Sequence, residues 1–231
     1  MSWLICAAVS LEAELVIPRL EPAPALGGRP SWQGQLGRRP VRLILTGMGL
    51  INAAQAVTAA LENLARLEGV INFGCAGAYA ESGLELGQAA VASQVVLADQ
   101  GVLTQRRRHG LEKIGIPLGR DPAGQRLYNR LPVDRGLSQE LTAAGGNLPR
   151  GPFASVVQVS GDRQTARELA RPWGAILEEM EGGAVALVAL HYGLPFAAVR
   201  GISNQAGARE LDLAAGARAA QRALLAWGES T

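Results

Sequence analysis

Short apolar runs alternate along this chain with segments of helical periodicity. Runs of strand length bounded by turn residues predict buried strands at residues 3–9, 42–46, 70–73, 89–97, 155–159 and 195–199. Apolar positions three and four residues apart predict helices over 52–66, 181–192 and the final segment from Leu213 to Trp227. A short helix is predicted between Ser10, which can cap it, and Pro18, which ends it. The alternation predicts an α/β fold, a three-layer α/β/α sandwich with a mixed, mostly parallel sheet.

Two segments lack this regularity. Residues 21–40 are rich in proline and glycine and predict a loop with an edge hairpin strand. Residues 100–150 show little periodicity and predict surface loops with one short helix. No internal repeat divides the chain, and its 231 residues suit one α/β unit. Residues 1–231 are therefore predicted to form a single domain.

Composition and charge narrow the functional classes. Apolar residues make up 48% of the chain, and the net charge is +2 from 22 basic and 20 acidic residues. This balance gives no electrostatic reason to expect nucleic acid as a partner. Neither an apolar run near the ~18 residues of a membrane span nor a basic signal sequence is found, so we expect a cytoplasmic protein. Two cysteines and two distant histidines predict no metal site, and no cofactor is expected.

Candidate chemistry follows the predicted strands, because ligands bind at the carboxyl ends of parallel strands. The segments to inspect are residues 10–14, 46–52, 74–79, 160–164 and 200–207. Gly47-Met48-Gly49 nearly matches a dinucleotide fingerprint, but Asn52 replaces its third glycine. No acidic residue ends a strand about 20 residues later, so a nicotinamide cofactor is not favoured. Two interpretations of this loop stay open: a tight turn that passes close to a ligand, or one that packs closely against a helix.

Polar residues stand out near two of these strand ends. Glu178, Glu179 and Glu181 crowd the start of an apolar helix, either as a solvated cap or as carboxylates that reach sugar hydroxyls. Arg200 ends an apolar strand and needs an acidic partner or an anion. Asn204 is either a turn residue or an amide that reads the edge of a base.

Several ordered segments resemble the nucleoside phosphorylase and nucleosidase superfamily along almost the whole chain. The matching segments are residues 8–15, 46–54, 70–77, 86–101, 157–162, 179–184 and 195–204. Within the superfamily the chain is most similar to the futalosine hydrolases, through Met180-Glu181-Gly182, through residues 200–204 and through Arg209 close behind. The resemblance implies hydrolysis of the N-glycosidic bond of futalosine, a purine nucleoside of menaquinone biosynthesis, with release of hypoxanthine. It also implies a homo-oligomer, a dimer or larger.

The resemblance also assigns roles to residues. Glu12 takes the position that activates water, where the phosphorylase branches carry phosphate-binding arginines on early loops. Asn204 would stabilise the departing base, and Glu181 with Met180 would hold the ribose. The remaining substrate-binding residues expected are Cys75, Ala76, Gly77, Glu179, Arg200 and Ser203.

Alternatives stay open at this point. Glu12 could be only an acid in the first turn of a helix. A methylthioadenosine or S-adenosylhomocysteine nucleosidase, another purine nucleosidase or phosphorylase, and a nucleoside-binding protein without activity all compete. Asn204 argues against the methylthioadenosine or S-adenosylhomocysteine nucleosidase, because adenine-cleaving relatives typically carry Asp at this position. Residues 163–166 contain no aromatic side chain, whereas those relatives usually place a base-stacking aromatic residue in this segment. Arg106, Arg107 and Arg108 either meet the carboxylate of futalosine or form a solvated loop.

Overall fold

A computed structural model describes residues 1–105, 108–121, 123–208 and 210–230. Its α-helices are α1 (Leu50–Asn63), α2 (Arg135–Ala144), α3 (Arg163–Ala170), α4 (Gly182–His191) and α5 (Leu213–Glu229). The strands of the main sheet are β1 (Ser2–Ala7), β2 (Leu20–Leu26), β3 (Arg29–Leu36), β4 (Arg39–Leu45), β5 (Leu67–Ala78), β6 (Ala89–Leu97), β11 (Arg130–Pro132), β12 (Arg150–Ser155), β13 (Leu177–Glu179) and β14 (Phe196–Gln205). Two small pairs combine β7 (Val102–Leu103) with β8 (Arg108–His109) and β9 (Gly119–Arg120) with β10 (Arg126–Leu127).

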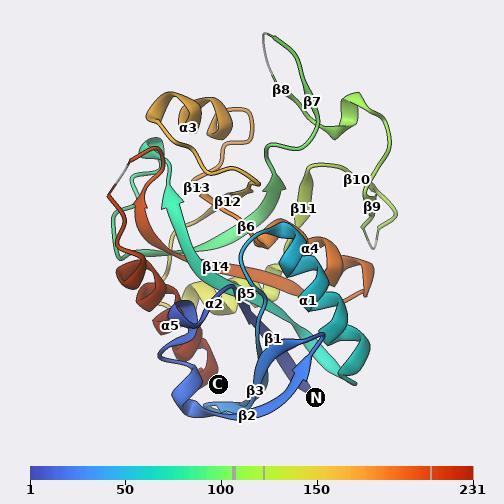
Figure 1. Ribbon diagram of the computed structural model, residues 1–231, viewed down its shortest axis with the longest axis vertical. Coiled ribbons are helices and arrows are strands. Elements are labelled where there is room, and N and C mark those ends of the chain that lie inside the picture. The colour runs from blue at the N-terminus through green and yellow to red at the C-terminus, as the bar shows by residue number, and fades with distance from the viewer. Residues whose placement is uncertain (106–107, 122, 209, 231) are drawn as a thin grey trace.

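The main sheet is mixed, and part of it closes on itself. Strand β5 pairs with β14, β14 with β6, β6 with β12, β12 with β13, and β13 returns to β5. Strands β1, β4, β3 and β2 extend from β5 as an open sheet (Figure 1). The α/β class and the mixed sheet are confirmed, whereas the sheet is barrel-like rather than the middle layer of a sandwich. The ring closes at β5, because one edge of this strand pairs with β1 up to Asn72 and then with β13 at Gly77 and Ala78. The other edge of β5 pairs with β14.

Helices cover both faces of β5. Val70 packs in a cluster with residues of α1 and α4, and the next residue, Ile71, packs in a second cluster with α2 and α5. Successive side chains of a strand point to opposite faces, so neighbouring apolar residues of β5 can serve both clusters. The apolar stripe predicted for the C-terminal segment is confirmed, because Leu224 and Trp227 are fully buried there. No helix in the described ranges is both long and apolar enough to span a membrane.

Two predicted elements differ in kind. Residues 21–40 are mostly strand, because β2 pairs with β3 and β3 with β4, and only the turns at 27–28 and 37–38 are left between them. Prolines suit β2, which lies at an edge of the sheet where a missing N–H costs no ladder bond. Ser10 does not cap an α-helix: Ser10–Ala13 and Ile17–Arg19 are separate 3-10 turns, with Val9 at the first N-cap.

Other elements differ in extent. β5 and β14 run through Gly74–Gly77 and Arg200–Asn204, both predicted to be turns after strands. β12 ends at Ser155, where the sequence predicted a strand to begin. Helix α2 is the one short helix expected within 100–150, but β11, β13 and α3 were not predicted. β11 and β13 are only three residues long and partly polar, and they form by pairing with β6 and with β12 and β5. α3 is a short, mostly polar helix.

Candidate functional site

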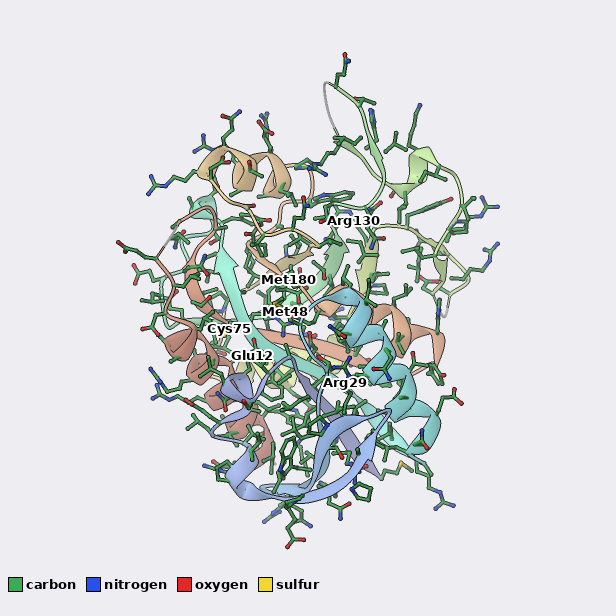
Figure 2. The ribbon with its side chains drawn as sticks, in the orientation of Figure 1. Glu12, Arg29, Met48, Cys75, Arg130 and Met180 are labelled. Carbon is green, nitrogen blue, oxygen red and sulfur yellow. The ribbon has the colours of Figure 1, made fainter. Side chains whose placement is uncertain are left out.

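A cavity of about 410 Å³ opens beside the carboxyl end of β1 and the last residues of β5 and β14. Its walls include residues from all five segments singled out in the sequence, for example Glu12, Met48, Cys75, Ser160 and Asn204. Figure 2 shows Glu12, Met48, Cys75 and Met180 gathered beside the centre of the sheet. This volume lies within the range of small-molecule sites.

Glu12 is fixed at one wall of the cavity by main-chain donors. Its Oε1 accepts a hydrogen bond from the Cys75 amide at 2.7 Å, and its Oε2 accepts one from the Ala8 amide at 2.9 Å. A Cβ atom at Gly74 would lie 2.4 Å from Glu12 Oε1, so only glycine lets β5 approach this carboxylate. Glu12 is therefore buried and bound by amides from β5 and from the residue after β1, and it is not a solvated acid at a helix end.

Glu181 precedes α4 and is held by the loop before α1. Its Oε1 accepts a hydrogen bond from the Gly49 amide at 2.8 Å. Burial, followed by the negative charge of Glu179, raises the pKa of Glu181 to about 7. The Gly47–Met48–Gly49 loop thus serves the site through one amide and the Met48 side chain, which lines the cavity.

Behind Glu181 lies a buried ion pair between Arg200 and Glu179. The Arg200 guanidinium is 1% exposed, donates to Glu179 Oε2 at 2.5 Å and to Asn72, and lies 3.8 Å from Glu181 Oε2. Glu179 Oε2 also accepts from the amides of Glu181 and Gly182. Arg200 was expected to contact substrate, but it does not line the cavity, and the acidic partner that it needs is Glu179. Sequence analysis did not single out Asn72. The one sign of its role is that it is a polar residue within an apolar run.

Glu178 serves a different part of the site. It accepts hydrogen bonds from the amide and hydroxyl of Ser160 and from the Tyr79 hydroxyl, at 2.9, 2.7 and 3.1 Å. These contacts tie the segment after β12 to β13. All three glutamates are less than 10% exposed, so they do not form a solvated helix cap.

Asn204 and Cys75 line the cavity from neighbouring strands. Asn204 Nδ2 donates to the main-chain oxygen of Gln205 at 3.0 Å, and Asn204 Oδ1 accepts from the Ser203 hydroxyl at 2.8 Å. The Cys75 thiol donates to the Leu213 oxygen at 3.3 Å, and burial raises its pKa to about 12. Ala76, Gly77 and Ser203 also line the cavity.

Nearly the whole chain matches one protein family. The model of the phosphorylase superfamily matches residues 4–226. The chain belongs to the phosphorylase superfamily.

Individual relatives are consistent with this assignment. Futalosine hydrolase of Thermus thermophilus is 38% identical over 216 residues, covering 90% of this chain and 85% of that protein. The 5'-methylthioadenosine/S-adenosylhomocysteine nucleosidase of Mycobacterium bovis is 30% identical over 194 residues, covering 76% and 73%. Two solved structures share the fold at 21% identity. The Neisseria meningitidis nucleosidase has a TM-score of 0.82, with 100% and 99% of the two chains covered. The futalosine hydrolase of Helicobacter pylori has a TM-score of 0.78, with 98% and 97% covered.

Apolar side chains also line the cavity. Besides Met48 and Met180, its wall includes Val159, Leu211 and Leu213. Of these, sequence analysis had noticed only Met180 as a site residue. Leu213 was noted only as the first residue of the apolar stripe on α5, and not as a residue of the site.

The remaining expected residues lie elsewhere. Residues 163–166 form the first turn of α3 and do not line the cavity, and Gln164 there donates to Glu168. Arg108 is exposed in β8 and likewise does not line the cavity, whereas Arg106, Arg107 and Arg209 fall outside the described residues. Among the residues that are described, no three His, Cys, Asp or Glu side chains are placed to hold a metal ion.

Proposed function

We propose that this protein is an N-glycosyl hydrolase that cleaves futalosine and releases hypoxanthine in menaquinone biosynthesis. The observation that carries the proposal is one cavity lined by two fixed carboxylates, Glu12 and Glu181, and by the amide of Asn204. The relationship to the Thermus futalosine hydrolase supports the choice of substrate. We further propose that it acts in the cytoplasm as a homo-oligomer.

The reaction breaks the bond between C1′ of the ribose and a ring nitrogen of the purine. As in other glycosyl transfers, the sugar acquires oxocarbenium character while negative charge grows on the base. The water oxygen bonds to C1′ as the bond to the base breaks, and Glu12 accepts the proton that the water loses. Asn204 donates a hydrogen bond to the departing base, which stabilises the developing charge. Glu181 accepts hydrogen bonds from ribose hydroxyls, and Met180 packs against the sugar.

Charge around the cavity favours water over phosphate as the second substrate. Four glutamates line it, at positions 12, 178, 179 and 181. The nearby guanidinium of Arg200 is already paired with Glu179. A phosphate dianion in this cavity would meet like charges, whereas a carboxylate can polarise water.

An adenine-releasing nucleosidase is the second candidate, because such enzymes are also among the relatives. Asn204 distinguishes the two functions. An amide N–H can donate to N7 or O6 of a 6-oxopurine, whereas adenine presents an amine at the same edge.

A substrate panel tests this choice. Wild-type protein is incubated separately with futalosine, inosine and methylthioadenosine, and free base is quantified by chromatography. We expect hypoxanthine from futalosine at the highest kcat/KM. Faster release of adenine from methylthioadenosine would replace the proposed substrate with the alternative.

A further inference from the structure

One peptide group in the loop before α1 faces Glu181 with its N–H and Asn52 with its oxygen. The Gly49 amide donates to Glu181 Oε1 at 2.8 Å, and the Met48 oxygen accepts from Asn52 Nδ2 at 2.8 Å. The Met48 oxygen and the Gly49 nitrogen belong to the same planar trans peptide group, so they point in opposite directions. A hydrogen bond that fixes the oxygen therefore also aims the N–H at Glu181.

The backbone alone does not hold this peptide group in place. Gly49 has a φ of +89°, and glycine adopts positive and negative φ with similar ease. Rotation of the peptide group would turn the Met48 oxygen toward the Glu181 carboxylate and place two acceptors against each other. Asn52 opposes this rotation, because its side-chain NH₂ holds the Met48 oxygen on the other side. The residue that replaces the third glycine of the fingerprint thus has a specific contact in the loop.

Arg29, the first residue of β3, fixes the orientation of the Asn52 amide. Its Nη2 donates to Asn52 Oδ1 at 2.6 Å. A guanidinium only donates hydrogen bonds, so the amide oxygen must face Arg29 and the NH₂ group must face the Met48 oxygen. Gly47 leaves room for this contact, since a Cβ atom there would lie 2.8 Å from Arg29 Nη1. Both ends of the Asn52 amide therefore have partners that allow only one orientation.

We propose that Asn52 and Arg29 are positioning residues for Glu181: they hold the Met48–Gly49 peptide group so that its N–H orients this carboxylate toward the ribose. The inference rests on the proposed function, because it takes Glu181 as the residue that binds ribose. Asn52 and Arg29 do not line the cavity themselves, so they act on the substrate through the loop.

The charges around Glu181 make the position of this N–H measurable. Besides burial, the charges of Glu179 in β13 and of Glu12 raise the pKa of Glu181. The charge of Arg200 in β14 and the hydrogen bond from the Gly49 amide lower it. A peptide group that turns away should therefore raise the pKa of Glu181, the direction opposite to the removal of Glu179.

The test titrates the Glu181 carboxyl directly, in protein without ligand. Glutamate is labelled with ¹³C at its side-chain carboxyl carbon, and the Glu181 resonance is identified by its absence from the E181Q variant. In N52A the pKa of Glu181 should rise by about one pH unit, the scale of one lost hydrogen bond to a charged group. N52A removes no charge, so the rise reports the lost contact. R29M should raise the pKa in the same direction, and it replaces N52A if that variant does not fold.

A double variant separates the contact of Arg29 from its charge. Because Arg29 acts through Asn52, the pKa of Glu181 in R29M/N52A should be no higher than in N52A alone. Rises that add in the double variant, or an unchanged pKa in R29M, would overturn the role of Arg29.

A matched control removes the other amide that Arg29 holds. Gln55 lies on the next turn of α1, accepts from Arg29 Nε at 3.1 Å and donates to the Gly27 oxygen at 3.1 Å. Its partners therefore lie in the hairpin instead of in the loop that binds Glu181. Q55A should keep the wild-type pKa of Glu181. An unchanged pKa in N52A, or an equal rise in Q55A and N52A, would overturn the inference.

The proposed function can fail independently. Because the titration uses protein without ligand, a raised pKa in N52A would support the positioning role even if the wild type released no base from futalosine. That lack of release would reject the hydrolase assignment alone. Conversely, active futalosine hydrolysis with an unchanged pKa in N52A would reject only the positioning role.

Discussion

Glu12 owes its position to two main-chain amides, and the hydrolytic step depends on that carboxylate. Glu12→Gln should lower kcat by about 10²–10⁴, the range for loss of a general base, while KM changes little because the side chains are nearly isosteric. Steady-state kinetics on futalosine measures both. Glu14→Gln is the matched control, since Glu14 is exposed and its Oε1 lies 3.7 Å from Arg218 Nη1 instead of in the cavity. Wild-type kcat in a folded Glu12→Gln protein would reduce Glu12 to a structural acid.

Glu181 should make activity depend on pH. Its pKa is raised to about 7 by burial and by Glu179, so the ionised form that accepts hydrogen bonds from ribose is lost as the pH falls through 7. We expect kcat/KM to decline on the acidic side of about pH 7. Glu179→Gln removes the neighbouring negative charge and leaves Arg200 to Glu181, so this limb should move to lower pH. A lower plateau with an unmoved limb would assign Glu179 a purely structural role.

The sequence predicted the place of some residues at the cavity but not of others. Met180 and Asn204 were placed by their motifs, and both line the cavity. Arg200 has a partner that the sequence had allowed for, an acid, but its identity as Glu179 depends on the pairing of strands distant in sequence. Tyr79 could not be singled out, because an aromatic residue in an apolar stretch carries no sign that its hydroxyl reaches Glu178.

Among the elements, β5 connects the site to the core. Its glycine at position 74 admits Glu12, and its Cys75 amide binds that carboxylate. Gly74→Ala should displace the carboxylate and lower kcat by about 10²-fold, the scale of a misplacement near 1 Å. Gly136→Ala in α2 is the control, since its Cβ would make only an ordinary contact at 3.4 Å and alanine favours helix. Unchanged kcat in Gly74→Ala would show that Glu12 tolerates displacement.

Element types were predictable where the pattern was strong. β6 matches its predicted bounds, 89–97, because it is one apolar run between turn residues. The sequence predicted the ends of β5 and β14 too early, because Gly74 and the polar residues from Arg200 onward break the apolar pattern. Their pairing with each other carries both strands on to Ala78 and Gln205. Ser203 and Asn204, which the sequence placed in a turn, therefore lie in a strand and line the cavity.

On the scale of the whole molecule, the closed ring and the open sheet share β5. We infer that residues 1–231 form one domain, because neither part keeps its pairing without this strand. Far-UV circular dichroism and tryptophan fluorescence should therefore report coincident thermal transitions. The probes are well distributed: Trp3 packs edge-on against Trp227 beside the open sheet, while Trp173 donates to Ala98 next to the ring. Two separated transitions would contradict a single domain.

The central claim is hydrolysis of a purine nucleoside by water that Glu12 activates. Its most direct test is the product formed from futalosine in phosphate-free buffer and again in saturating phosphate, analysed by mass spectrometry. The account predicts equal rates of hypoxanthine release in both buffers, with the free sugar as co-product. Release that requires phosphate and yields a sugar 1-phosphate would contradict it.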